Sequence, residues 1–246
     1  MAIGEYKADC CLNRTTTGGG MAALFSPSNL QLLQSIMRFK SFAAGAYLFW
    51  EGERTEALYY VEKGSVKITK STDGGSKITL YLHHAGDLLG SLDPFQDGPQ
   101  PYDAEVTEDA VIGVIHRKDL ESLLKQHGEL AFELMKWMGM MHRITQTKLR
   151  DLIMYGKPGA LCSLLIRLSN SYGIAQGSDI RIGKKMTHSD MAELIGATRE
   201  SVNRMLADMK KEEAIAVEQG TIVIKDIDYL RDICHCENCP KEICRV

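Results

Sequence analysis

The most reactive side chains of this sequence are four cysteines crowded together close to its carboxyl end. Cys234, Cys236, Cys239 and Cys244 form the pattern C-x-C-x2-C-x4-C. Thiolates separated by two to four residues can converge on one soft metal centre, because a short chain can fold around an ion. Structural zinc sites usually contain two separated ligand pairs, whereas a single compact run with a proline after its third cysteine favours an iron–sulfur cluster. The pattern therefore favours a cluster and leaves zinc open.

The remaining composition indicates where such thiols would be found. The 246 residues include seven cysteines, an odd number, and the first residues show no export signal. These features argue against a disulfide framework and predict a reducing compartment, the cytoplasm. Residues 1–24 are small, polar and rich in glycine, so we expect a flexible extension in which Cys10 and Cys11 have no role. The sequence contains no apolar run of about 18 residues, so we expect no membrane span.

The first half of the chain predicts an antiparallel barrel or roll. An amphipathic helix over residues 28–37 is followed by short β-branched or aromatic runs, with turn residues between them. The runs cover residues 46–50, 58–61, 65–69, 78–82 and 110–115, and the turns 51–53, 62–64 and 73–75. No catalytic motif lies inside this region, and we expect no enzyme.

A long helix follows over residues 129–155. Apolar residues recur in it at intervals of four and three, which is the spacing of a coiled-coil seam between two copies of the chain. The seam contains Leu130, Leu134, Trp137, Met141 and Ile144, and then becomes polar at Lys148 and Asp151. Asp151 either faces water or fixes the register of the pair, or it faces a site at the end of the helix. The seam alone favours the first interpretation.

Beyond this helix the sequence predicts a nucleic-acid-binding module. Gly156 and Pro158 break the helix, and a further helix covers residues 160–172. Thr187 caps another helix, Gly196 begins a three-residue turn, and residues 199–211 form a third helix. Helix, glycine turn and helix form a helix-turn-helix, and residues 214–217 and 221–224 add a hairpin wing.

The charge distribution supports this interpretation. Residues 157–211 contain nine Lys or Arg and five Asp or Glu, whereas residues 21–124 contain nine and fourteen, within a net charge of -3 for the chain. A locally basic module suits contact with phosphates. The third helix buries an apolar face and presents Arg199, Glu200, Asn203 and Arg204 outside. Arginine can donate two hydrogen bonds to guanine, and a carboxylate can accept one from cytosine.

This organisation resembles the CRP/FNR family of bacterial transcription regulators over residues 25–230. The resemblance implies an α+β protein with a cupin-like or cyclic-nucleotide-binding-like β-roll, a dimerisation helix and a winged helix-turn-helix. The expected domains are an extension over 1–24, a roll over 25–125, a dimerisation helix over 126–155, a DNA-binding domain over 156–230 and a tail over 231–246. Double-stranded DNA, RNA polymerase and a second copy of the chain are the implied partners.

The third helix resembles the form of that family with the motif R-E-x-x-x-R. At matching positions Arg199, Glu200 and Arg204 would contact the major groove of a palindromic, TGTGA-like site. The FNR form proper has serine immediately before the last arginine, where this chain has Asn203. The resemblance therefore favours the TGTGA-like preference.

The phosphate-binding segment of the family is altered in this sequence. Gly86 to Gly90 resembles its first part, but Tyr102 and Asp103 stand where the family has an Arg-Ser pair that holds a cyclic phosphate. An acidic side chain repels a phosphate, and the bidentate arginine contact is lost. We therefore expect no cyclic-nucleotide sensing, although a cyclic-AMP-type regulator stays an alternative.

The tail resembles that of the Gram-positive, bacillus-type branch of FNR proteins. In that branch three tail cysteines and one aspartate of the dimer helix hold a [4Fe–4S] cluster. The matching residues are Cys236, Cys239, Cys244 and Asp151. On this resemblance we expect Asp151 to face a site at the end of the helix, and no longer to face water or fix the register. Cys234 stays an alternative fourth ligand. The resemblance implies an oxygen-responsive regulator of anaerobic metabolism, and a regulator with a structural zinc tail is the remaining alternative.

Overall fold

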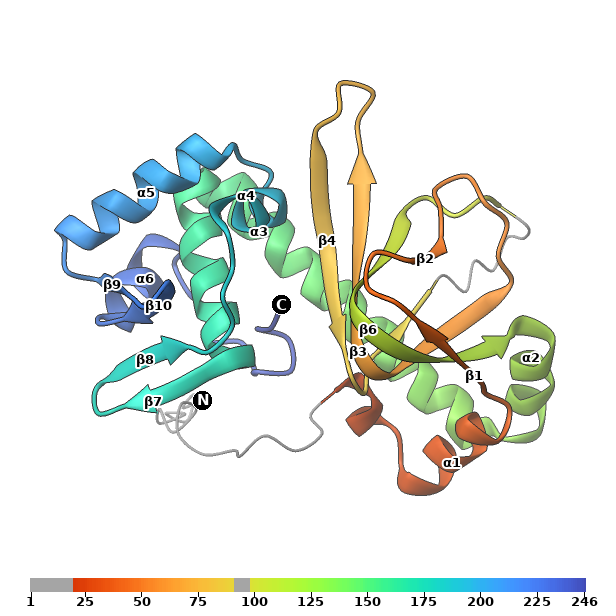
Figure 1. The fold of residues 1–246 in the computed structure, drawn as a ribbon. Coiled ribbons are helices and arrows are strands. Elements are labelled where there is room, and N and C mark those ends of the chain that lie inside the picture. Colours follow the sequence, from red (N-terminus) through yellow and green to blue (C-terminus); the bar gives the residue numbers. More distant parts are fainter. Residues whose placement is uncertain (1–19, 91–97) are drawn as a thin grey trace, which may run out of the picture. The chain divides into compact units, whose positions relative to one another are not determined.

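The computed structural model of the chain describes residues 20–90 and 98–246 (Figure 1). Cys10 and Cys11, with most of the expected N-terminal extension, lie outside these residues. The described part divides into two compact units, which are described separately here. One contains residues 20–143 and 192–196, and the other contains residues 144–191 and 197–246.

The first unit is built around an antiparallel roll. Its sheet has the strand order β1-β6-β3-β4, with β2 paired to β6 and β5 paired to β3. The strands are β1 (Arg38–Phe42), β2 (Tyr47–Phe49), β3 (Ala57–Ser71), β4 (Lys77–His84), β5 (Leu88–Leu89) and β6 (Asp103–His116). The 3-10 helix η1 (Met21–Leu24) and helix α1 (Pro27–Ser35) precede the roll, and α2 (Arg117–Gln126) follows it. The predicted antiparallel roll is confirmed.

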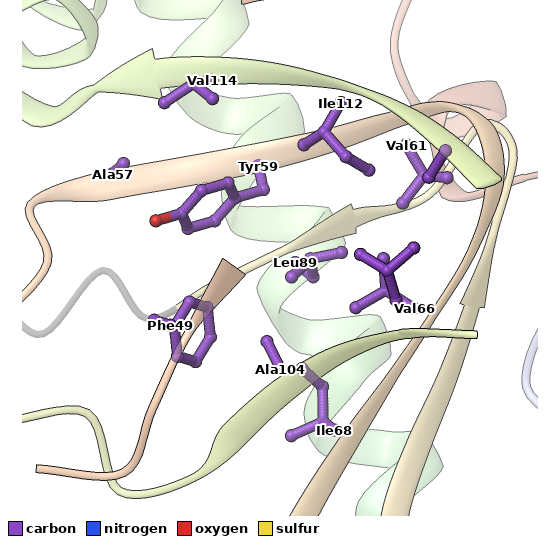
Figure 2. Packing of buried hydrophobic residues seen from close by; sticks show 12 residues of the cluster. Phe49, Ala57, Tyr59, Val61, Val66, Ile68, Leu89, Ala104, Ile112 and Val114 are labelled. Atoms are coloured by element: carbon purple, nitrogen blue, oxygen red, sulfur yellow. The ribbon is translucent and has the colours of Figure 1, made fainter. Parts of the chain in front are cut away.

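The interior of the roll is filled by its own apolar side chains. Figure 2 shows them gathered between the strands, with Phe49 and Tyr59 at one end and Val61 and Val66 at the other. Val61, Val66, Ala104 and Ile112 have no exposed surface. Burial of apolar surface contributes about 25 cal/mol per Å², so this cluster stabilises the unit.

Strand β3 corrects one part of the sequence prediction. The sequence predicts two strands separated by a turn at 62–64, but β3 continues through these residues. Its register against β6 shifts between Val61 and Ser65, and Gly64 has a φ of 88°. The extra residues are thus accommodated in a β-bulge, in which glycine adopts a left-handed conformation without strain.

Helix α3 (Gly128–Tyr172) follows α2 and consists of two helical segments separated by a kink. Gly156 has φ 60° and ψ -164°, which is not helical, and Pro158 follows two residues later. Proline lacks an N–H to continue the hydrogen bonding, and glycine tolerates the left-handed φ. The break lies where the sequence predicts it.

The second unit contains the end of α3, a four-stranded sheet and the remaining helices. The sheet has the order β7-β8-β10-β9. The elements are β7 (Gly173–Gln176), β8 (Asp179–Ile182), α4 (His188–Ile195), α5 (Arg199–Lys211), β9 (Ile215–Glu218), β10 (Thr221–Ile224) and α6 (Ile227–Ile233). The sequence predicts α4, α5 and the hairpin of β9 and β10, but not β7, β8 or α6. None of the described helices is both long and apolar enough to cross a membrane.

Candidate functional site

The cysteine-rich tail is folded into turns that begin at the end of α6. Asp226 caps this helix by accepting from the backbone N–H groups of Asp228 and Tyr229, and Cys234 ends it. His235 and Asn238 then adopt positive φ values of 44° and 51°. These turns leave Cys234 and Cys244 buried and Cys236 and Cys239 partly exposed.

The tail lies against the second half of α3. Asn170 Nδ2 donates to the carbonyl oxygen of Cys244 at 2.8 Å, and Arg167 Nη1 donates to that of Ile243 at 3.2 Å. The backbone N–H of Val246 donates to Ser171 Oγ at 3.2 Å. The end of the chain is therefore anchored to α3 by side chains of the helix.

Two contacts connect the beginning of the tail to the first half of α3. Arg150 Nη1 forms an ion pair with Glu237 Oε2 at 2.5 Å. The rings of Tyr155 and His235 stack with their centroids 4.8 Å apart. Residues on both sides of the break at Gly156 thus hold the segment that carries the cysteines.

Asp151 lies in the same region and is almost completely buried, with 2% of its surface exposed. Its Oδ1 accepts from Arg150 Nε at 3.0 Å and Nη2 at 2.6 Å. Its Oδ2 accepts from Ser163 Oγ at 2.5 Å and from Arg167 Nη2 at 3.1 Å. The expectation that Asp151 faces water, drawn from the seam alone, is therefore wrong, because α3 beyond the break covers it.

The tail thiols influence one another electrostatically. A hydrogen bond from Cys234 lowers the pKa of Cys236 to about 6, opposed by desolvation and assisted by the N–H of Asn238 and by Arg231 and Arg150. The same hydrogen bond, followed by burial, raises the pKa of Cys234. Burial raises the pKa of Cys244 to about 11, opposed by the charge of Arg167 and assisted by the charges of Cys236 and Cys239. Cys236 and Cys239 therefore both lie within electrostatic reach of Cys244.

The donor chemistry of this region suits an iron–sulfur cluster. Three thiols supply soft ligands and Asp151 a harder oxygen, while Arg150 and Arg167 offset negative charge. Over residues 20–90 and 98–246, no three His, Cys, Asp or Glu side chains are already arranged around a common metal position. Both oxygens of Asp151 are occupied by arginine and serine donors, so ligation requires Asp151 to exchange partners.

The helix-turn-helix presents a polar face on α5. Thr198 caps this helix by accepting from the N–H of Ser201, and Val202, Leu206 and Met209 form its buried side. The predicted DNA-contacting residues, Arg199, Glu200, Asn203 and Arg204, are all exposed. None of these four side chains has a hydrogen-bond or ion-pair partner in the described part of the chain. Thr187 and Asp190 form the predicted capping box of α4, with mutual bonds of 2.9 and 3.1 Å.

The altered phosphate segment of the roll has internal partners. Asp103 Oδ1 accepts from the N–H of Glu51 at 2.8 Å, and Tyr102 is 38% exposed. Leu88 and Leu89, in the segment that precedes it, are buried. The position at which the resemblance would place an arginine thus holds an exposed aromatic ring beside an occupied carboxylate.

Four of the residues expected at the dimer seam are buried within the single chain. Leu130, Leu134, Trp137 and Ile144 have at most 5% of their surface exposed, and Met141 is partly buried. Their spacing is accounted for by packing inside the chain, and a dimer interface at these residues stays a prediction. The exposed apolar residues of α3 lie on another face: Phe132, Met135, Met138, Leu149, Ile153 and Met154.

An antiparallel roll, a long helix and a winged helix-turn-helix together define a two-domain, DNA-binding regulator. Two family models match the chain, a cyclic nucleotide-binding domain over residues 39–127 and a Crp-like helix-turn-helix domain over residues 159–233. The "Anaerobic regulatory protein" of Bacillus subtilis is 43% identical over 225 residues, which cover 91% of this chain and 94% of that protein. The chain therefore belongs to the CRP/FNR family of transcription regulators and is not an enzyme.

More distant relatives have the same organisation. The "CRP-like cAMP-activated global transcriptional regulator" of Mycobacterium tuberculosis is 29% identical, with 83% of this chain and 91% of that protein covered. The solved structure of the c-di-GMP responsive regulator CLP of Xanthomonas campestris matches with a TM-score of 0.71 at 16% identity, covering 81% of this chain and 99% of that one. FixK2 of Bradyrhizobium japonicum matches with a TM-score of 0.67 at 18% identity, covering 80% and 97%. These structural matches establish the fold alone.

Sequence reasoning missed the side chains that surround Asp151. Arg150, Ser163 and Arg167 were not predicted to contribute to the site. One signal was present, because Arg167 is the only charged residue in the mostly apolar segment from Leu161 to Leu168. A charged residue on a buried helix face requires a partner.

Proposed function

We propose that this protein is an oxygen-responsive transcription regulator of the bacterial cytoplasm, active as a homodimer under anaerobic conditions. A [4Fe–4S] cluster would be held by Cys236, Cys239, Cys244 and Asp151. The observation that carries the proposal is the anchoring of the cysteine tail to α3 beside buried Asp151. The name of the 43% identical relative, an anaerobic regulatory protein, supports the same class of signal.

In this mechanism the tail holds the DNA-binding domain on α3. Such a cluster, when bound, supplies a centre that reacts with oxygen or nitric oxide. Cys236, Cys239 and Cys244 would bind it from the tail and Asp151 from α3, so that the four ligands would join segments on opposite sides of the break at Gly156. An oxygen ligand exchanges more readily than a thiolate, which suits a site that must open.

The DNA-binding step depends on the spacing of two α5 helices. Successive major grooves on one face of the duplex are about 34 Å apart, so both copies of α5 must be held at that separation. When the tail is released, the domain moves about Gly156 and only a fraction of dimers keep the competent arrangement. The apparent affinity falls in proportion to that fraction.

Recognition of DNA is assigned to the exposed residues of α5. Arg199 and Arg204 would donate to guanine and Glu200 would accept from cytosine in a palindromic, TGTGA-like site. Asn203 lies beside them on the same exposed face. RNA polymerase is the further partner through which such a regulator would act.

The homodimer would use the exposed apolar face of α3. Met135, Leu149 and Ile153 lie on this face at helical spacing, with Gly139, His142 and Gln146 between them. An exposed apolar stripe on a helix is typical of an interface between copies. The seam side chains that begin at Leu130 are buried within the chain, and their part in the dimer stays a prediction beside this face.

Anaerobic purification followed by visible spectroscopy and iron and sulfide analysis tests the proposal. We expect broad absorbance near the violet end of the spectrum, iron and sulfide in equal amounts, and a DNase footprint over a palindromic site that is lost in air. Asp151→Ala should lose both the absorbance and the footprint. Zinc without visible absorbance, or a footprint indifferent to air, would contradict it.

Cyclic-nucleotide control is the second candidate, because the roll matches a cyclic nucleotide-binding family and the 29% identical relative is named as cAMP-activated. The observation against it is the Tyr102-Asp103 pair, whose Asp103 carboxylate bonds the backbone of Glu51. Calorimetric titration with cyclic AMP distinguishes the two candidates. Binding in the micromolar range would favour nucleotide control.

A further inference from the structure

The buried guanidinium of Arg167 makes four different contacts that join three segments of the second unit. Its Nε donates to Ser163 Oγ at 3.2 Å, and its Nη2 donates to Thr147 Oγ1 and Asp151 Oδ2, each at 3.1 Å. Its Nη1 donates to the carbonyl oxygen of Ile243 at 3.2 Å. Thr147 and Asp151 precede the break at Gly156, Ser163 follows it, and Ile243 belongs to the tail.

These contacts satisfy the buried charges of Asp151 and Arg167. Asp151 and Arg167 are 2% and 5% exposed, and a buried charge is tolerated only when its hydrogen-bonding capacity is satisfied. Asp151 accepts four hydrogen bonds, about the full capacity of a carboxylate. No lone pair of Asp151 is left for an iron ion while these bonds are in place.

We propose that Asp151 has two mutually exclusive sets of partners, and that Arg167 is a positioning residue of the cluster-free state. In that state Arg167, with Ser163 and Arg150, holds Asp151 away from metal and simultaneously anchors the tail through Ile243. To serve as a ligand, Asp151 would have to give up at least one of these hydrogen bonds. This inference rests on the proposed cluster function and names the residues that oppose ligation.

If iron and the hydrogen-bond donors compete for Asp151, removing a donor changes the rate of cluster loss in one direction. A merely structural role of the donor predicts a change in the opposite direction. Weakening the hold on Asp151 makes the carboxylate more available to iron, so the cluster should be lost more slowly in air. Weakening the fold alone would expose the site and make the loss faster. The direction of the change therefore separates the two explanations.

Ser163→Ala is the sharpest variant for this test. It removes the hydroxyl that bonds Asp151 Oδ2 and Arg167 Nε, while the bond from Arg167 to Ile243 in the tail is unaffected. We expect the absorbance of the anaerobically loaded protein to decay about tenfold more slowly in air, as loss of a hydrogen bond to a charged group implies. Ser171→Ala, which removes a tail contact remote from Asp151, should not slow the decay. Decay at the wild-type rate or faster in Ser163→Ala would overturn the competition.

Arg167→Gln tests the anchoring of the tail in the cluster-free protein. Amide hydrogen exchange of full-length protein prepared without iron should be at least fivefold faster over residues 243–246 than in the wild type, because the Ile243 carbonyl loses its donor. Ser163→Ala should leave this exchange unchanged. Wild-type protection in Arg167→Gln would contradict the anchoring role.

The two measurements also separate this inference from the proposed function. If anaerobic wild-type protein has no visible absorbance, the cluster assignment fails, and with it the competition for Asp151. The exchange experiment uses no metal and still decides whether Arg167 anchors the tail. If the wild type has the absorbance but Ser163→Ala does not retain it longer, the proposed function stands and the competition is wrong.

Discussion

Asp151 and Arg167 form an ion pair in which both side chains are almost completely buried. Removing both charges from water is costly, and their attraction offsets this cost only when all donors and acceptors are satisfied. Here Arg150 completes the set, because it bonds Asp151 and also pairs with Glu237 of the tail. Such a pair is weak evidence for stability and better evidence for a specific arrangement of segments.

The cysteines should differ strongly in their reactivity toward iodoacetamide. The thiolate is the nucleophile, so a thiol reacts readily only above its pKa. In cluster-free protein Cys236, whose pKa is lowered to about 6, should react at a rate that is constant above pH 7 and falls below pH 6. Cys162, whose pKa burial raises to about 12, should stay unmodified at pH 8. Peptide mass spectrometry after labelling at several pH values measures both, and equal labelling of the two residues would contradict the assignment.

Specificity for DNA should depend on Arg204 much more than on lysines at the end of the same helix. Arg204→Ala should weaken binding to the palindromic site by about 1–3 kcal/mol, because a bidentate contact to a base is lost, and should leave non-specific binding nearly unchanged. Lys211→Ala, exposed in the last turn of α5, is the matched control. Titrations against specific and random duplexes at one salt concentration measure the ratio of specific to non-specific affinity. This ratio should change only for Arg204→Ala.

Among the secondary-structure elements, strand β3 shows where local patterns mislead. Glycine after two charged residues usually predicts a turn, and residues 62–64 have this composition. The long partner strand β6 instead pairs with β3 on both sides of Gly64. The strand pairing, which joins residues far apart in the sequence, therefore overrides the local preference.

Gly64→Ala should destabilise the protein more than a substitution at another left-handed glycine. A Cβ at Gly64 would lie 2.6 Å from the carbonyl oxygen of Asp109, whereas one at Gly75 meets nothing within 4 Å. Both positions have a positive φ, which costs an alanine roughly 1–2 kcal/mol. Gly75→Ala should lose about that amount, and Gly64→Ala about 1–3 kcal/mol more through the clash. Urea unfolding followed by circular dichroism compares them, and equal losses would show that the bulge can open.

At the level of the whole molecule, the long helix has two apolar faces with different roles. One face, including Leu130 and Trp137, is buried within the chain. The other, including Met135 and Leu149, is exposed. A helix that is apolar on more than one face is normally buried on each, which is why we propose the exposed face as the contact with a second copy of the chain.

A charge on the exposed face should therefore disrupt the dimer. Leu149→Glu places a carboxylate in the proposed interface, where burial without a partner is unfavourable. We expect sedimentation of a monomer at micromolar concentrations, with the circular dichroism spectrum unchanged. Lys125→Glu, exposed in α2, makes a larger change in charge and should leave the dimer intact. A dimer in both variants would return the interface to the seam that begins at Leu130.

The elements with regular apolar spacing, and the breaks and caps marked by particular residues, could be predicted from the sequence of this protein. The roll, the break at Gly156, the capping box of Thr187 and the exposed face of α5 all follow from patterns between neighbouring residues. The cysteine spacing likewise identifies the tail as a place for metal chemistry. These features depend on contacts within a few positions of each other, so the order of residues suffices to specify them.

The environment of Asp151 was decided only by tertiary structure. Its partners Ser163 and Arg167 come from beyond the helix break, and the tail they meet is more than seventy residues further along the chain. Which face of α3 is buried inside the chain was likewise decided only by the tertiary structure. Spacing along a helix shows which side chains share a face, but which surface covers that face depends on segments distant in the sequence.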